Sequence, residues 1–230
     1  MKHKFLTQEH LKLLACLLML IDHIGFLNLV PGYYTELRTI GRLAFPVFCF
    51  LLCEGFLHTH NRSKYMLRLA IGAVLSEIPF NLLVSGQVFY IYKQSVMITL
   101  LLAFCMAMLM EKTDKTPLKI LLIVPFYLLA DLLNTDYGGA GVLMVAIFLL
   151  TEKLPLKLLW QTGLLLLSQF FVSSWKLTFF GISFPIQVFA VFAMVPIALY
   201  SGKKTTHSRT LQWAFYLFYP VHMAILWFLR

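Results

Sequence analysis

Residues 39–57 read TIGRLAFPVFCFLLCEGFL, a stretch with one arginine, one glutamate and otherwise almost only apolar or small side chains. A helix of this length and composition can cross the hydrocarbon core of a bilayer. Similar stretches recur along the chain, so that 60% of the 230 residues are hydrophobic and only 13% are charged. The sequence therefore predicts an integral membrane protein rather than a soluble domain.

Further apolar stretches are separated by residues that break helices, such as the pairs Pro31-Gly32 and Ser85-Gly86. We predict an all-α fold, a polytopic transmembrane helical bundle of about nine spans, with about eight or ten as alternatives, in a single domain over residues 1–230. The shortest span is the weakest prediction. The predicted spans are 11–30, 39–57, 65–84, 96–110, 117–134, 139–151, 156–174, 183–201 and 211–229.

Basic residues gather on one side of this bundle. With about nine spans, 14 of the 19 Lys and Arg residues fall on the side of the N-terminus, which the positive-inside rule assigns to the cytoplasm. Their clustering between apolar stretches also argues against a nucleic-acid partner. The 14 residues are Lys2, Lys4, Lys12, Arg62, Lys64, Arg68, Lys112, Lys115, Lys119, Lys153, Lys157, Lys203, Lys204 and Arg209. The other five are Arg38, Arg42, Lys93, Lys176 and Arg230.

A metal centre is not expected. His58 and His60 alternate instead of lying one helical turn apart, and few carboxylates accompany them. The cysteines lie within apolar stretches without the spacing of zinc ligands, so we interpret them as reduced hydrophobic residues. They are Cys16, Cys49, Cys53 and Cys105.

Ionisable side chains inside the predicted spans are the main functional candidates, because a charge within a bilayer is costly unless it is paired or hydrated. Each of the acids can instead belong to an ion pair that only fixes helix packing, such as Arg42 with Asp22 or Glu77. Both interpretations stay open. The candidates are Asp22, His23, Arg42, Glu54, Arg68, Glu77, Asp131 and His222.

His23 has the chemistry of a general base near neutral pH. Lys12 precedes it by eleven positions, so on a helix the two lie about 16 Å apart along the axis and roughly 20° apart around it. Lys12 and His23 thus lie at the two ends of one helix face, a cation at one end and a base at the other. This arrangement fits a long substrate with an anionic head and a reactive tip, such as coenzyme A. Asp22 points about 100° away from His23 and is better placed to contact another helix.

A second dense group of basic residues lies in the cytoplasmic segment 58–68. Their charge and hydrogen-bond donors suit the phosphates of a cytosolic acyl donor. The alternative is an ordinary positive-inside loop. The residues are His58, His60, Arg62, Lys64 and Arg68.

Five segments together resemble the TraX family of membrane proteins: LIDHIG (20–25), GRLAFPVFCFLLCEGFLHT (41–59), RLAIGAVLSEIPFNL (68–82), LNTDYGGAGV (133–142) and YLFYPVH (216–222). The founding activity of that family is N-terminal acetylation of a pilin subunit, in conjugative transfer. It is similar to a wider group of membrane acyltransferases that includes the acyltransferase-3 family and the heparan glucosaminide N-acetyltransferases. The acyltransferase-3 spacing of a basic residue and a first-helix histidine matches Lys12 and His23, whereas its Arg-x-x-Arg pair is replaced by Lys64 and Arg68.

The resemblance implies an acyltransferase of the bacterial cytoplasmic membrane that carries an acetyl group from cytosolic acetyl-CoA to an amine or hydroxyl at the outer side. We expect His23 to be the base and Arg42 to stabilise the oxyanion. Asp22 and Glu77 complete the expected catalytic residues, and Glu77 is expected to position the acceptor. The alternative is a non-enzymatic carrier or assembly factor of a transfer system. The remaining residues expected to bind the acceptor are Glu54, Asp131, Asp136, Tyr137 and His222.

Overall fold

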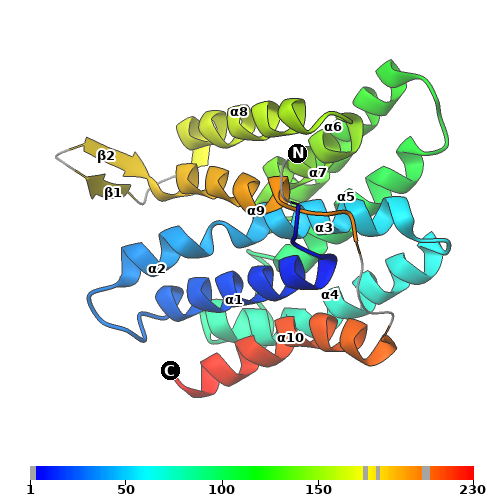
Figure 1. The fold of residues 1–230 in the computed structure, drawn as a ribbon. Helices are drawn as coiled ribbons and strands as arrows, with labels where there is room; N and C mark the ends of the chain where they lie inside the picture. Colours follow the sequence, from blue (N-terminus) through cyan, green and yellow to red (C-terminus); the bar gives the residue numbers. More distant parts are fainter. Residues whose placement is uncertain (1–3, 173–175, 180–181, 204–207) are drawn as a thin grey trace. The chain divides into compact units, whose positions relative to one another are not determined.

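The computed structural model describes residues 4–172, 176–179, 182–203 and 208–230 (Figure 1). Lys2, Lys204 and the end of the predicted span 156–174 lie outside the described residues. The elements in chain order are α1 (Gln8–Phe26), α2 (Tyr34–Gly41), α3 (Ala44–His58), α4 (Arg62–Ser85), α5 (Val96–Met110), α6 (Thr116–Leu132), α7 (Gly138–Leu150), α8 (Leu154–Val172), β1 (Lys176–Phe179), β2 (Ile182–Pro185), the 3₁₀ helix η1 (Ile186–Ala193), α9 (Met194–Ala198) and α10 (Arg209–Phe228).

Most predicted spans coincide with helices. The stretch 96–110 is α5 to the residue, and the weakest stretch, 139–151, forms the 13-residue α7. In the described residues, two helical stretches are both long and apolar enough to cross a membrane, Tyr34–His58 and Arg62–Ser85. The helical fold is therefore confirmed, whereas the number of spans and the side of the N-terminus stay predictions.

The predicted span 183–201 is wrong, because this stretch is divided among β2, η1 and α9. β2 pairs with β1 as an antiparallel hairpin in which Lys176 faces Pro185, so the fold is not purely α-helical. The sequences KLTF and ISFP have the branched and aromatic side chains that favour strands. Pro196 lies in the first turn of α9, where a missing N–H is tolerated, and this favours a new helix over a continuation of η1.

The predicted span 39–57 is also interrupted. α2 ends at Gly41 and α3 begins at Ala44. Pro46 occupies the first turn of α3, which is the position a helix allows to proline. The break places Arg42 between two helices instead of inside one.

The chain forms two compact units. The first comprises residues 1–51, 152–215 and 230, and the second comprises residues 52–151 and 216–229. Leu11, Val47 and Ala190 are fully buried in the first, and Phe104 and Met106 in the second. Each unit is described by itself below.

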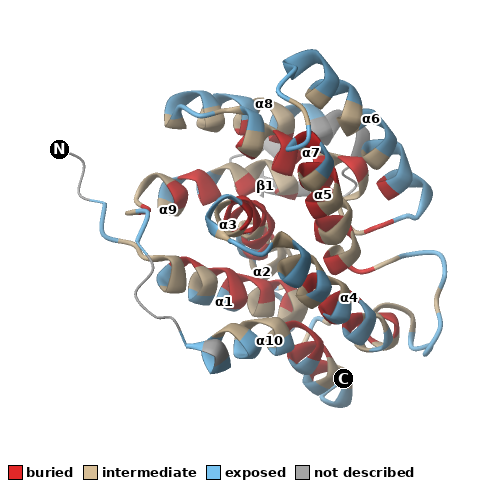
Figure 2. Cartoon of the chain, turned by 90° about the vertical axis from the view of Figure 1, so that its right-hand side faces the viewer, coloured by how far each residue is buried: buried red, intermediate tan, exposed pale blue. Residues whose placement is uncertain are grey.

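Burial differs sharply between two helices of the second unit (Figure 2). Eight of the 15 residues of α5 are buried, whereas Ala130 is the single buried residue of the 17 in α6. Val74 of α4 and Leu128 of α6 expose 72% and 59% of their surface. Apolar surface of this extent is typical of helices that face lipid, and it supports assignment to a membrane.

Candidate functional site

Two glycines allow α1 and α2 to approach closely in the first unit. A Cβ at Gly25 would lie 2.8 Å from Cβ of Leu37, and a Cβ at Gly41 would overlap Asp22. Both glycines have helical geometry, so they are needed here for space and not for backbone conformation. The close approach brings Asp22, near the end of α1, against the end of α2 and the residue that follows it.

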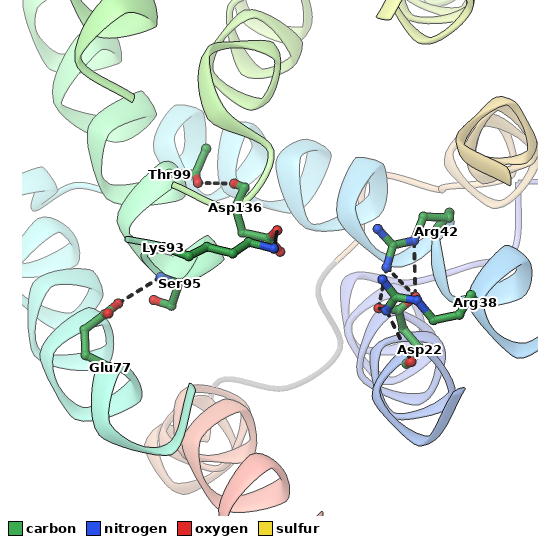
Figure 3. Close-up of polar contacts among 8 residues, drawn as sticks. All are labelled: Asp22, Arg38, Arg42, Glu77, Lys93, Ser95, Thr99 and Asp136. Atoms are coloured by element: carbon green, nitrogen blue, oxygen red, sulfur yellow. Dashed lines mark hydrogen bonds and ion pairs between the residues drawn. The ribbon is translucent and has the colours of Figure 1, made fainter. Parts of the chain in front are cut away.

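Asp22 is bound by two arginines in this first unit (Figure 3). Arg42 Nη2 lies 2.6 Å from both carboxylate oxygens, and its Nε lies 3.2 Å from Oδ1. Arg38 Nη1 donates to Oδ2 and to the Asp22 carbonyl oxygen. The side chains of Asp22, Arg38 and Arg42 are 12%, 16% and 14% exposed. We call these three residues the arginine cluster.

The arginine cluster holds two guanidinium charges and one carboxylate charge. Among the described residues Arg38 Nε is buried without a hydrogen-bond partner, and the Arg38 guanidinium lies 5.3 Å from the centre of the Phe26 ring. The printed ion pairs thus give one carboxylate for two guanidinium groups, and guanidinium donors suit carboxylate, phosphate or a developing oxyanion. Of the two pairings left open for Arg42, the one with Asp22 is present, and the role of Arg42 in stabilising an oxyanion stays a prediction.

Arg38 is a site residue that the sequence pattern did not indicate, since the predicted topology places it only among the five outer basic residues. A signal existed, because Arg38 precedes Arg42 by four positions and residues at this spacing share one face of a helix. Asp22 contacts another helix, as its direction on α1 predicted.

His23 and Lys12 lie on one uninterrupted helix, α1, so the spacing that places them on a shared face is confirmed. The Lys12 ammonium lies 5.5 Å from the centre of the Phe215 ring. His23 is half-buried and directly follows Asp22. The proposed base thus lies beside the arginine cluster in sequence, in the last turn of α1.

In the second unit, Glu77 and Asp131 bind the starts of two helices. Glu77 Oε1 accepts a hydrogen bond of 3.0 Å from the Ser95 N–H, the residue before α5. Asp131 Oδ1 accepts one of 2.6 Å from the Gly139 N–H in the first turn of α7. Carboxylates at helix N-termini accept hydrogen bonds from free N–H groups and interact favourably with the positive end of the helix dipole. These two hydrogen bonds support the interpretation that Glu77 and Asp131 fix the packing of helices, at least for Glu77 Oε1 and Asp131 Oδ1.

Asp136 and Tyr137 belong to a loop that is fixed by its backbone. Asp136 pairs with Lys93 at 3.2 Å, its N–H donates to the Gln94 carbonyl, and its own carbonyl accepts from the Thr99 hydroxyl. Tyr137 has φ +67° and Gly138 φ +48°. A left-handed backbone at a tyrosine is strained, and such strain marks a site where the surrounding contacts dictate the conformation.

His222 is 5% exposed on α10. Its Nδ1 lies 2.7 Å from the Phe218 carbonyl oxygen, and its ring stacks on the Phe218 ring at 4.9 Å. A carbonyl partner makes Nδ1 the protonated nitrogen of the neutral ring, so Nε2 carries the lone pair that a base needs.

The predicted donor-binding residues are only partly brought together. Arg62 Nη2 lies 2.7 Å from Glu111 Oε1, and His58 Nδ1 lies 3.9 Å from Glu54 Oε2. Each of these two basic side chains therefore has a carboxylate beside it. Lys64 and His60 are exposed.

Arg68 differs from the other bases of the segment 58–68. No carboxylate pairs with it among the described residues, and its Nε is buried without a partner. Its guanidinium lies 5.5 Å from the Tyr65 ring centre and hydrogen-bonds the Tyr216 side chain. Arg68 is therefore the strongest candidate for an anionic ligand in this segment.

Comparison with known proteins supplies the family. A family model described as TraX protein matches residues 7–230. The chain is 34% identical over 241 residues to the "Probable fimbrial assembly protein FimC, serogroup H1" of Dichelobacter nodosus, with 94% of this chain and 92% of that protein covered. No solved structure matches the chain.

Proposed function

Because the chain belongs to the TraX family, we propose that it is a multi-pass acetyltransferase of the bacterial cytoplasmic membrane, with its N-terminus in the cytoplasm. Acetyl-CoA is the donor, and the acceptor is an amine or hydroxyl at the outer side. N-terminal acetylation of a pilin is the precedent of the family, and the name of the Dichelobacter nodosus relative places that protein in fimbrial assembly.

The arginine cluster carries this proposal. His23 Nε2 or Nδ1 accepts the proton of the acceptor while the acceptor nitrogen or oxygen attacks the thioester carbonyl. Arg38 and Arg42 stabilise the negative charge that develops on the carbonyl oxygen. The C–S bond then breaks, the acetyl group stays on the acceptor, and the coenzyme A sulfur takes a proton from His23. Asp22 holds both guanidinium groups in place.

The donor phosphates are assigned to basic residues of the cytoplasmic side. Arg68 leads this group because its Nε has no partner and no acid neutralises it among the described residues. Lys12, Arg62 and Lys64 add positive charge near the same predicted membrane face, and His58 adds a ring nitrogen that can donate a hydrogen bond. Acceptor binding is assigned to Glu54, Glu77, Asp131, Asp136, Tyr137 and His222.

The second candidate is a non-enzymatic assembly factor, and the name of the relative favours it. Purified full-length protein in detergent separates the two. An acetyltransferase binds coenzyme A and slowly hydrolyses acetyl-CoA without an acceptor, and Arg42→Gln lowers that hydrolysis. An assembly factor shows neither, and absence of both coenzyme A binding and hydrolysis would refute the enzymatic proposal.

A further inference from the structure

Three buried oxygen atoms on α4 and just before α5 have no hydrogen-bond partner in the part of the chain that the structure describes. They are Glu77 Oε2, Asn81 Oδ1 and Ser95 Oγ. Asn81 is 5% exposed and Ser95 is 0% exposed. Buried acceptors without a donor cost free energy, and native proteins keep few of them without a reason.

The three residues belong to one place in the second unit. Glu77 and Asn81 are four positions apart on α4, so their side chains are neighbours on one helix face. The 3.0 Å hydrogen bond from the Ser95 N–H to Glu77 Oε1 brings the start of α5 to the same carboxylate, as Figure 3 shows. Asn81 Nδ2 donates to the Val88 carbonyl at 3.2 Å, which leaves the amide oxygen as its unpartnered end.

The charge at this place is negative. No cation pairs with Glu77 among the described residues, and the nearby Lys93 is paired with Asp136. Tyr219 also interacts electrostatically with Glu77, and its hydroxyl oxygen accepts a hydrogen bond from the backbone of Val96. One carboxylate charge and a set of uncharged oxygen atoms thus remain without a positive partner.

We propose that Glu77, Asn81 and Ser95 form a binding site for a small monovalent cation, either free Na⁺ or the ammonium group of a larger molecule. Carboxylate, amide and hydroxyl oxygens are hard ligands that suit such cations, and one carboxylate matches one positive charge. A transition-metal site is not indicated, since the described residues contain no group of three His, Cys, Asp or Glu that could hold a metal ion. Binding of free Na⁺ goes beyond acetyl transfer, whereas binding of an ammonium group would deepen the acceptor role proposed for Glu77. The test below needs neither acetyl-CoA nor turnover, so it can fail independently of the proposed function.

Thermal unfolding of the full chain in detergent tests the site. NaCl or methylammonium chloride is titrated at constant ionic strength against choline chloride, whose quaternary nitrogen has no N–H to donate to these oxygen atoms. A cation that binds the folded state raises the unfolding midpoint in a saturable way. A rise with Na⁺ alone identifies a free ion, a rise with methylammonium alone identifies an ammonium group, and a rise with both identifies a site that takes either. No rise beyond choline with either cation overturns the proposal.

Two variants assign the effect to these residues. Glu77→Gln keeps an acceptor for the Ser95 N–H but removes the charge, and Ser95→Ala removes the hydroxyl. Each is expected to raise the half-saturating cation concentration about 10-fold or more. Wild-type half-saturation in both variants overturns the assignment, and if Ser95→Ala does not fold, Glu77→Gln decides alone.

Ser76→Ala is the matched control. Ser76 is also 0% exposed and precedes Glu77, but its hydroxyl is satisfied by the Gly72 carbonyl at 2.5 Å. Its variant is expected to keep the wild-type half-saturating concentration. A loss of the cation response in Ser76→Ala equal to that in Ser95→Ala would reduce the effect to helix packing and overturn the site.

Discussion

Both carboxylate oxygens of Asp22 lie 2.6 Å from Nη2 of Arg42. This contact joins α1 to the break between α2 and α3, and Arg38 binds the same carboxylate. Asp22 therefore has a role that is separate from proton transfer. It offsets the repulsion between two guanidinium groups that are each less than one fifth exposed.

Asp22→Ala is expected to destabilise the protein by about 3–5 kcal/mol, because it leaves two nearly buried guanidinium charges without a counter-charge. Thermal or denaturant unfolding in detergent measures this. Glu36→Ala is the control, since Glu36 is exposed on α2 and its loss is expected to cost at most about 0.5 kcal/mol. Equal effects of the two variants would contradict a structural role of the Asp22 charge.

Gly41→Ala is expected to separate α1 from α2, because the added Cβ overlaps Asp22. A forced shift of packed elements typically costs about 1–3 kcal/mol. Gly163 in α8 is the matched control, since a Cβ there meets nothing within 4 Å and Ala is the better helix former. Unfolding midpoints of both variants decide, and an unchanged midpoint for Gly41→Ala would show that the helices tolerate the extra carbon.

The positions of most helices follow from hydropathy alone, as the exact agreement at Val96–Met110 illustrates. Hydropathy failed at Ile182–Pro185 because the residues of β2 are as apolar as those of the helix that follows, so the strand and the helix look like one stretch. The hairpin also depends on pairing with a second segment, β1. Hydropathy did find the stretch around Arg42, since Tyr34–His58 is long and apolar enough to cross a membrane. It did not show the two-residue break between α2 and α3, because a proline in the first turn of a helix does not lower the apolar character of a stretch.

The sequence predicts the residue types of the site but only one of its pairings. Asp22 and Arg42 were expected to pair, whereas the second arginine of the cluster, Arg38, was not expected. The contacts of Glu77 with Ser95 and of Asp131 with Gly139 join a side chain to a backbone N–H. Backbone N–H groups have no signature in the sequence, so such contacts require the folded geometry.

Neutralising Arg68 together with Lys64, as Arg68→Gln and Lys64→Gln, is expected to weaken coenzyme A binding. Each lost charge-assisted hydrogen bond costs about 1.5–3 kcal/mol, which is roughly a 10- to 100-fold loss of affinity. The matched control removes two other basic residues, Lys112 and Lys115, which are exposed. Isothermal titration with coenzyme A gives the affinities. Equal affinity of both double variants for coenzyme A would contradict a role of Arg68 and Lys64 in donor binding and would leave them only the positive charge of a cytoplasmic loop.

The proposed topology places Lys203 in the cytoplasm and Lys176 outside. Single cysteines at these positions, in a chain whose native cysteines are replaced, are expected to react differently with an impermeant thiol reagent added to intact cells. Cysteine at 176 should be labelled, and cysteine at 203 should be labelled only after lysis. Strong labelling at 203 but not at 176 in intact cells would contradict an arrangement of about nine spans with a cytoplasmic N-terminus.

His23→Ala is expected to lower acetyl transfer by roughly two to four orders of magnitude, which is the typical effect of removing a general base. Coenzyme A binding should change little, because the proposed phosphate contacts are made by other residues. His222 is the rival base and the control, since its Nδ1 is bound to the Phe218 carbonyl and its Nε2 is the nitrogen with the lone pair. Turnover and coenzyme A affinity are measured for His23→Ala and His222→Ala, and they show which histidine is the base. If His23→Ala keeps wild-type turnover and His222→Ala does not, His222 is the base and the spacing from Lys12 to His23 has no catalytic meaning. If both variants stay active, neither His23 nor His222 is the base, and the proposed histidine mechanism is wrong.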